Sequence, residues 1–299
     1  MARRQISLDN LPASLPLDHP VERIEQEASV ALAHRLIAGR RPMVVPGLAK
    51  RWPALQAWSF EWLSQRVGEQ EVLVERGNIM QHSSRFEPVR MRDYLLALAE
   101  GRKEEGEFRY LASLDLFDRV PEFARDIDFD WLGAALPMQF RFAWVGPVNT
   151  VSGYHYDRPD NVVVMIRGRK LIHLVSPDQS AWMYASNKFD YGATLSSVDA
   201  LAPDLKLHPN FARVRPISVV LEPGDALFIP HHWWHHVVSL DPSISVNCFA
   251  YRRSRFLAVE AGEMFKALLH HFRLYATSCT CHQWVDGVRH PKPGKHPLI

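Results

Sequence analysis

Two residues with metal-binding side chains stand two positions apart in the segment Tyr154-His155-Tyr156-Asp157. Alternate side chains of a β-strand point to the same face, so His155 and Asp157 would place an imidazole and a carboxylate side by side. With one further histidine, such a pair forms the facial triad that holds Fe(II) in non-haem oxygenases and leaves coordination positions open. The same spacing also occurs in ordinary surface pairs. The metal-site interpretation therefore depends on a second histidine from a distant strand.

Candidates for that histidine lie in the segment GDALFIPHHWWHH, which runs from Gly224 to His236. A turn, a short apolar strand and a strand-ending proline place the first two histidines, His231 and His232, in a connecting loop. The other two, at positions 235 and 236, fall on opposite faces of the following strand. Strand periodicity alone does not decide which of these two completes the triad.

The composition limits the class of protein. The chain has 299 residues, of which 47% are hydrophobic and 23% charged, a balance that excludes wholesale disorder. Its 35 Lys and Arg against 33 Asp and Glu give a net charge of +2, which provides no electrostatic case for nucleic-acid binding. Three cysteines do not make a disulfide framework, and we find neither a secretory signal nor a bilayer-length apolar run. We therefore expect a cytoplasmic protein without a membrane partner.

The secondary structure predicted to position these side chains changes near residue 106, from helices with a few strands to a run of short strands. Before it, helical periodicity predicts helices over residues 21–38, with Gly39 as C-cap, and over residues 91–99, while Ser59 caps a third helix. Strands are expected at 42–47 and 72–74, and a charged loop at 101–107. From 106 to 253, eight short apolar runs separated by turn residues indicate an antiparallel sandwich or barrel.

Two sequence blocks resemble the core of the JmjC-type, cupin-fold 2-oxoglutarate oxygenases. The first is HYDRPDNVVVMIRGRKLIHLVSP, which begins at His155, and the second is LEPGDALFIPHHWWHHVVSLDPSISVN, which begins at Leu221. The motifs are most similar to the small hydroxylase branch, which includes the asparaginyl hydroxylase acting on hypoxia-inducible factor and the wybutosine-modifying tRNA hydroxylase. The upstream segments PMVVPGLAKRWPAL and WSFEWL are similar to the same branch, so the resemblance covers residues 41–253.

The resemblance implies a mainly β fold with flanking helices around a double-stranded β-helix, the jelly-roll core of cupins and JmjC domains. It implies Fe(II) held by His155, Asp157 and His235, because the family's distal ligand is the first histidine after the aromatic pair. The cosubstrates 2-oxoglutarate and O2 would take the remaining positions. The other histidines of the second block would lie in the loop or behind the ligands: His231, His232 and His236.

The family anchors the far carboxylate of 2-oxoglutarate on a lysine fifteen residues after the first histidine, which here is Lys170. The physics agrees, because a lysine buried among apolar neighbours requires an anion. The resemblance maps four more residues onto the cosubstrate pocket: Tyr110, Ser152, Asn161 and Asn247. Ser152 departs from the more usual threonine and loses a methyl group. Four aromatic residues could line the pocket mouth but are more typical of the core: Trp144, Trp233, Trp234 and Phe249.

The reaction implied is hydroxylation of an amino-acid side chain in a protein or peptide substrate. Three alternatives remain: N-methyl-lysine demethylation and tRNA-base hydroxylation by the same iron chemistry, and a non-catalytic cupin that only binds metal. No reader domain accompanies the core in this sequence, which favours hydroxylation over demethylation. The near-zero net charge disfavours a tRNA substrate. The presence of Lys170 beside the triad disfavours the non-catalytic cupin.

The C-terminal part combines a helical pattern with a cysteine motif. We expect a JmjC/cupin-like catalytic domain over 1–253, with N-terminal elements at 21–105 and the β core at 106–253, and a helical segment with a loose tail over 254–299. An apolar stripe on this helix is expected to join two copies as a homodimer: Phe256, Leu257, Met264, Phe265, Leu268, Leu269 and Phe272. Dimerisation through C-terminal helices in related hydroxylases favours the same interpretation.

The motif Cys279-Thr280-Cys281-His282 has the composition of part of a metal site, although the sequence has no second cysteine pair to complete it. One of three nearby histidines could supply the missing ligand: His270, His271 or His290. A loop with free thiols is the alternative.

Overall fold

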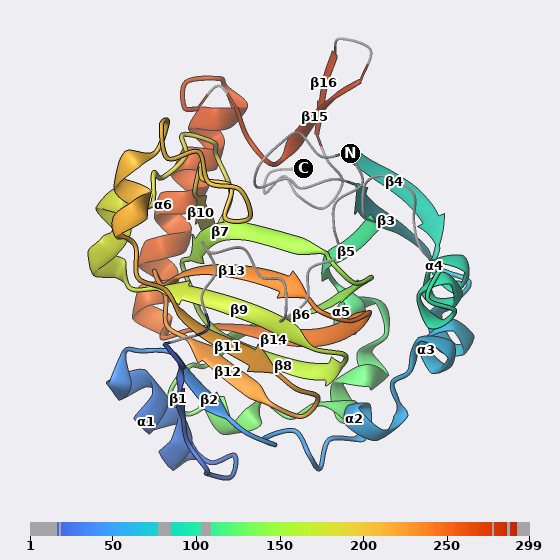
Figure 1. Ribbon diagram of the computed structural model, residues 1–299. Helices are drawn as coiled ribbons and strands as arrows, with labels where there is room; N and C mark the ends of the chain where they lie inside the picture. The colour runs from blue at the N-terminus through green and yellow to red at the C-terminus, as the bar shows by residue number, and fades with distance from the viewer. Residues whose placement is uncertain are drawn as a thin grey trace.

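Two β-sheets packed face to face form the centre of the computed structural model, which describes residues 17, 19–76, 85–102, 109–276, 278–285 and 288–291 (Figure 1). The larger sheet contains β1 (Glu22–Arg23), β2 (Met43–Val45), β3 (Glu71–Arg76), β4 (Arg85–Arg90), β5 (Arg109–Leu114), β6 (Met138–Gly146), β8 (Asp160–Arg167), β12 (Ala226–Ile229) and β14 (Ser243–Tyr251). The smaller sheet contains β7 (Val151–Asp157), β9 (Lys170–Val175), β10 (Ala193–Leu195), β11 (Ile217–Leu221) and β13 (Trp234–Ser239).

Consecutive core strands alternate between the two sheets. The chain passes from β6 in the larger sheet to β7 in the smaller, returns through β8 to β9, and later repeats the alternation through β12, β13 and β14. The strand orders are β1-β2-β12-β8-β14-β6-β5-β3-β4 and β10-β7-β13-β9-β11. Among the strand pairs that the structure describes in these two sheets, only β1–β2 is parallel. This winding is the double-stranded β-helix, so the fold class predicted from the sequence is confirmed.

The interior strands are buried on both faces, which explains their unbroken apolar runs. In β8, Val162 and Val164 face the cluster shared with the N-terminal helices, while Val163 and Met165 face the space between the sheets. The helices that supply the outer cluster are short: α1 (Val30–Gly39), α2 (Pro53–Ala57), α3 (Phe60–Val67), α4 (Met91–Ala99) and α5 (Leu116–Arg119). Four 3-10 turns connect the remaining elements: Pro121–Asp126, Asp130–Leu132, Pro177–Trp182 and Pro209–Arg213.

The helix predicted over residues 21–38 is wrong in its first half. Ile24 donates its backbone N–H to Val44 (2.8 Å), beside the parallel pairing of β1 with β2. The apolar spacing of residues 21–29 is compatible with a helix, but pairing with β2 makes the start of this segment an edge strand instead. The helix begins at Val30, where the Ser29 hydroxyl accepts the N–H of Leu32. It includes Gly39, so the left-handed capping residue is Arg40 (φ 48°) rather than the glycine.

The other N-terminal expectations hold within the described residues. The helix over Met91–Ala99 has the predicted bounds, and the Ser59 hydroxyl caps α3 by accepting the N–H of Trp62. The expected strands at 42–47 and 72–74 correspond to β2 and β3. Three stretches lie outside the described residues: most of the expected charged loop at 101–107, residues 77–84, and all of the first sixteen residues.

The C-terminal helix α6 (Arg253–His271) runs along the side of the sandwich where β10 lies (Figure 1). Its inward face carries Glu263, Ala267 and His270, so most of the predicted apolar stripe faces outward, with Phe265 61% exposed. The tail expected to be loose instead contains a hairpin of β15 (His282–Val285) and β16 (Val288–Pro291), in which the proline is the last edge-strand residue. No helix in the described part of the chain has the length and apolar run that crossing a bilayer requires.

Candidate metal centre and cosubstrate cavity

The strands β7 and β13 bring three predicted metal ligands together. Their antiparallel register pairs His155 directly with His235, and Asp157 follows two residues along β7 on the same face. Nε2 of His155 lies 3.9 Å from Oδ1 of Asp157, and Nε2 of His235 lies 3.5 Å from Oδ2. One ligand atom from each residue lies within 4.8 Å of the others, as a facial triad requires.

Backbone carbonyls orient both imidazoles. Nδ1 of His155 is 2.8 Å from the Gly153 oxygen, and Nδ1 of His235 is 3.1 Å from the Trp233 oxygen. A carbonyl oxygen only accepts, so each Nδ1 carries the proton and each Nε2 keeps its lone pair. That lone pair lies on the side of Asp157, which is the tautomer and orientation that a metal-binding histidine needs.

Burial disfavours charge at this site unless a cation is present. It raises the pKa of the Asp157 carboxyl and holds the pKa of His235 well below its ordinary value. A divalent cation would stabilise the carboxylate and would bind the His235 imidazole in its neutral form. The donor set of two nitrogens and one carboxylate oxygen therefore fits Fe(II).

The remaining histidines of the second block lie where the sequence placed them. His231, in the loop, contacts Oδ1 of Asp160 through both its backbone N–H (2.9 Å) and Nδ1 (2.7 Å). The backbone N–H of His232 donates to the Asp157 carbonyl (3.0 Å), which fixes the loop to the end of β7. His236 points to the opposite face of β13 and is fully buried. The strand register thus distinguishes His235 from His236, which periodicity alone left open.

A cavity beside the triad is lined by residues of both sheets. Its lining comprises Tyr110, Trp144, Ser152, His155, Asp157, Asn161, Val163, Lys170, Ile172, Ile229, His235, Val237, Ser245, Asn247 and Phe249. All eight residues that the sequence assigned to iron or 2-oxoglutarate are among them. Their individual roles stay predictions, but their convergence on one hollow is a property of the fold.

Lys170 is the one buried cation in this lining. Its Nζ donates to the Ser245 hydroxyl (2.8 Å) and to the Tyr110 hydroxyl (3.3 Å), and no described carboxylate forms an ion pair with it. Burial lowers the pKa of Lys170 to about 7. A carboxylate bound in the cavity would restore the full charge of this ammonium group, so the surroundings fit the far carboxylate of 2-oxoglutarate.

Two amides connect the cavity wall to the Asp157 carboxylate, one of the predicted metal ligands. Asn247 donates to Oδ1 of Asn161 (3.2 Å), and Asn161 lies 3.5 Å from Oδ2 of Asp157. Ser152 stands on β7 opposite Val237 of β13 and lines the same hollow. The Oδ2 atom of Asp157 therefore lies between the Asn161 amide and Nε2 of His235, each 3.5 Å away.

Ser245 was not predicted as a site residue, and Trp144 and Phe249 had been left unassigned between pocket and core. Strand alternation could have found two of them, because Ser245 and Phe249 flank the predicted Asn247 at two-residue spacing on β14. Trp144 is the partner of Ser245 on β6. By contrast, Trp234 is outside the lining and donates its indole N–H to Ser180 (2.9 Å).

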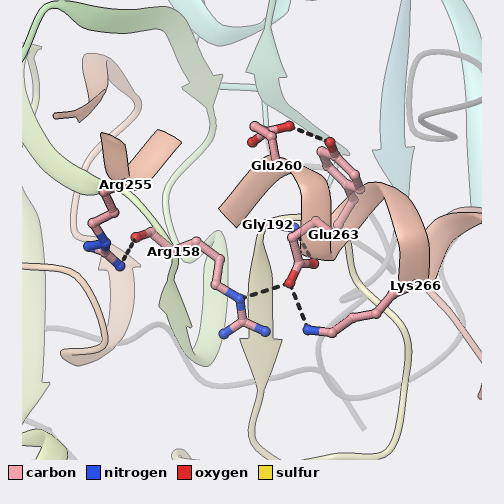
Figure 2. Close-up of polar contacts among 7 residues, drawn as sticks. Arg158, Gly192, Arg255, Glu260, Glu263 and Lys266 are labelled. Carbon is pink, nitrogen blue, oxygen red and sulfur yellow. Dashed lines mark hydrogen bonds and ion pairs between the residues drawn. The ribbon is translucent and has the colours of Figure 1, made fainter. Parts of the chain in front are cut away.

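Charged side chains hold α6 against the edge of the site (Figure 2). Glu263 accepts from Arg158 (3.1 Å) and from Lys266 (2.8 Å), and its second oxygen lies 3.4 Å from the backbone nitrogen of Gly192. Arg255 donates to the Arg158 carbonyl (2.7 Å). Burial opposes ionisation of Glu263, but Lys266 and Arg158 outweigh that effect and lower the pKa of Glu263. Because Arg158 follows Asp157, the network ties α6 to the end of β7.

Comparison with known proteins gives one family. The model of the cupin-like domain matches residues 29–255, about three quarters of the chain. The chain is 34% identical to lysine-specific demethylase 8 of Xenopus tropicalis, over 70% of this chain and 47% of that protein. It is 31% identical to Jumonji C domain-containing protein 5 of Drosophila melanogaster, over 69% of this chain and 54% of that protein.

A plant relative extends the comparison. Lysine-specific demethylase JMJ30 of Arabidopsis thaliana is 30% identical over 69% of this chain and 49% of its own length. The chain thus spans about half the length of these curated relatives. The JmjC resemblance seen in the two sequence blocks is confirmed.

Proposed function

This chain belongs to the cupin-like, JmjC-type domain family, and we propose that it is an Fe(II)- and 2-oxoglutarate-dependent oxygenase that demethylates N-methyl-lysine in a protein substrate. One observation carries the oxygenase proposal: a single cavity joins a His-Asp-His set with free Nε2 lone pairs to a buried lysine that has no carboxylate partner among the described residues. A metal-binding cupin without turnover would have no use for that lysine.

Each group has a distinct task in this proposal. His155, Asp157 and His235 hold Fe(II), while Lys170 and the Tyr110 hydroxyl bind the far carboxylate of 2-oxoglutarate. With 2-oxoglutarate and O2, the iron centre supplies an oxidation in which 2-oxoglutarate becomes succinate and CO2, and one oxygen atom enters a substrate C–H bond. The apolar part of the lining keeps water from the reacting atoms: Val163, Ile172, Ile229 and Val237.

The choice of N-methyl-lysine rests on the relatives' names and on one local feature. Trp144 and Phe249, both only partly buried, line the cavity with ring centroids 5.8 Å apart and planes at 65°. Aromatic faces attract methylated ammonium groups. Oxygen inserted into an N-methyl C–H bond gives an N–CH2–OH group, whose C–N bond then breaks to release formaldehyde and the amine.

The experiment uses reconstituted protein with Fe(II), 2-oxoglutarate and O2, and a peptide panel that carries mono-, di- or trimethyl-lysine or unmodified residues. Demethylation predicts formaldehyde and peptides lighter by one CH2 unit, in step with succinate. Peptides heavier by one oxygen atom without formaldehyde would replace demethylation with the side-chain hydroxylation expected from the sequence. Absence of succinate with every peptide and with added tRNA would favour the non-catalytic cupin.

A further inference from the structure

Four metal-binding side chains outside the iron triad meet at the end of α6. His270 lies in the last turn of this helix, and Cys279, Cys281 and His282 come from the segment that leads into β15. One ligand atom from each lies within 4.8 Å of the other three. The sequence left three histidines as the possible fourth ligand: His270, His271 and His290. In the structure, His270 is the one that lies in the cluster.

The distances within this cluster suit a tetrahedral ion. Nδ1 of His282 lies 3.3 Å from Sγ of Cys279 and 3.2 Å from Sγ of Cys281. A zinc ion with Zn–S bonds of ~2.3 Å and Zn–N bonds of ~2.0 Å places sulfur and nitrogen ligands about 3.5 Å apart in a tetrahedral site. Small outward shifts of the side chains would therefore make room for the ion.

His270 is oriented as a ligand. Its Nδ1 lies 2.9 Å from the Tyr275 carbonyl and 3.1 Å from the Ala276 carbonyl, so Nδ1 carries the proton and Nε2 keeps its lone pair. The side chain is 1% exposed, and its ring centroid lies 5.6 Å from that of His282. Carbonyl support of the distal nitrogen is the usual arrangement behind a metal-binding imidazole.

We propose that His270, Cys279, Cys281 and His282 bind a structural zinc ion. Two thiolates and two imidazoles fill a tetrahedral shell and leave no open position, which distinguishes this site from the three-ligand iron centre. The soft sulfur ligands favour zinc over the harder divalent cations. The proposal stands independently of the oxygenase function.

The ion would fasten the C-terminal segment to the wall of the iron site. Phe189 donates its N–H to Ser278 (2.9 Å) and accepts the N–H of Thr280 (3.0 Å), so the cysteine segment lies alongside the chain before β10. In turn, β10 pairs Ala193 with Asp157 of β7. Zinc would thus cross-link α6 to the cysteine segment, which is itself hydrogen-bonded to the chain before β10, on the side where Glu263 binds Arg158.

The test uses the full chain with the iron triad removed by His155→Ala and Asp157→Ala, so that zinc has no second place to bind. After incubation with zinc, removal of loose metal and mass-spectrometric metal analysis, we expect one zinc per chain. Adding Cys279→Ser and Cys281→Ser should abolish it. The matched control is His271→Ala, the exposed neighbour of His270, which should retain the full equivalent. A triad-free protein without zinc, or with zinc that survives loss of both cysteines, would overturn the proposal.

Cobalt gives a second measurement that does not depend on the folding of the cysteine variant. Co(II) added to the triad-free protein with all four ligands intact should produce thiolate charge-transfer bands and the strong visible absorption of tetrahedral cobalt. Chelation should remove both signals and lower Tm, and zinc should restore Tm. A weak octahedral cobalt spectrum without thiolate bands would count against the site even if zinc co-purified.

Discussion

Lys170 of the smaller sheet donates a hydrogen bond from Nζ to the Ser245 hydroxyl of the larger sheet (2.8 Å), and so crosses the interior of the double-stranded β-helix. The ammonium group is held by two hydroxyls rather than by a carboxylate. The two sheets therefore present a buried, preorganised cation to the cavity that contains the triad.

Replacing Lys170 should chiefly affect the cosubstrate. Lys170→Ala leaves a bound carboxylate buried and unpaired, at a cost of ~3–5 kcal/mol, so the 2-oxoglutarate requirement should rise by two orders of magnitude or more. Lys170→Arg should rescue binding only in part, because the planar guanidinium differs in length and shape. Calorimetric titration of the manganese-loaded protein measures both, and unchanged affinity in Lys170→Ala would contradict the assigned pocket.

The same lysine predicts a pH dependence. Its pKa of about 7 in the empty cavity must rise when a carboxylate binds, so binding takes up a proton. The affinity for 2-oxoglutarate should be level below pH 7 and weaken up to tenfold per pH unit above it, until the pKa of the complex is reached. In Lys170→Arg, whose cation does not titrate in this range, the decline should vanish. An equal decline in both proteins would mean that another group titrates.

Trp144 tests the preference for a methylated cation. Trp144→Leu keeps an apolar wall but removes the aromatic face, so binding of a trimethyl-lysine peptide should weaken by about 1–2 kcal/mol. A peptide with a neutral isostere, in which carbon replaces the quaternary nitrogen, should lose much less. Equal losses for the two peptides would remove the support that this ring gives to demethylation.

The outward face of α6 predicts self-association. Leu257 is 68% exposed, Phe265 61% and Phe272 63%, while the inward face is already occupied. Pairing two such helices about a two-fold axis would bury these side chains. Light scattering at micromolar concentration should therefore give twice the chain mass, and Leu268→Glu with Phe272→Glu should halve it. A wild-type protein of one chain mass would refute the dimer.

The sequence predicted the strands of the core closely, because fully buried β-strands carry their signal locally as apolar runs bounded by turn residues. Lys170–Val175 and Ser243–Tyr251 were read with their exact bounds. The segment 21–29 was misread, because its conformation depends on pairing with a strand that lies elsewhere in the chain.

The site shows the same division between local and long-range information. Asp157 follows from His155 by strand periodicity, whereas the choice between His235 and His236 depends on how β13 is registered against β7, with a shift between His235 and Val237. Ser245 was within reach of alternation from Asn247. The fourth ligand of the cysteine cluster was not, because His270 reaches it only through the turn that follows α6.

The central claim is that one cavity brings together Fe(II), held by His155, Asp157 and His235, and 2-oxoglutarate. Its most direct measurement is succinate formed from 2-oxoglutarate with Fe(II) and O2, compared among the wild type, His235→Ala and His236→Ala. The account predicts succinate from the wild type and from His236→Ala, and a fall to the metal-free background in His235→Ala. Wild-type succinate formation in His235→Ala, or loss confined to a stably folded His236→Ala, would contradict it.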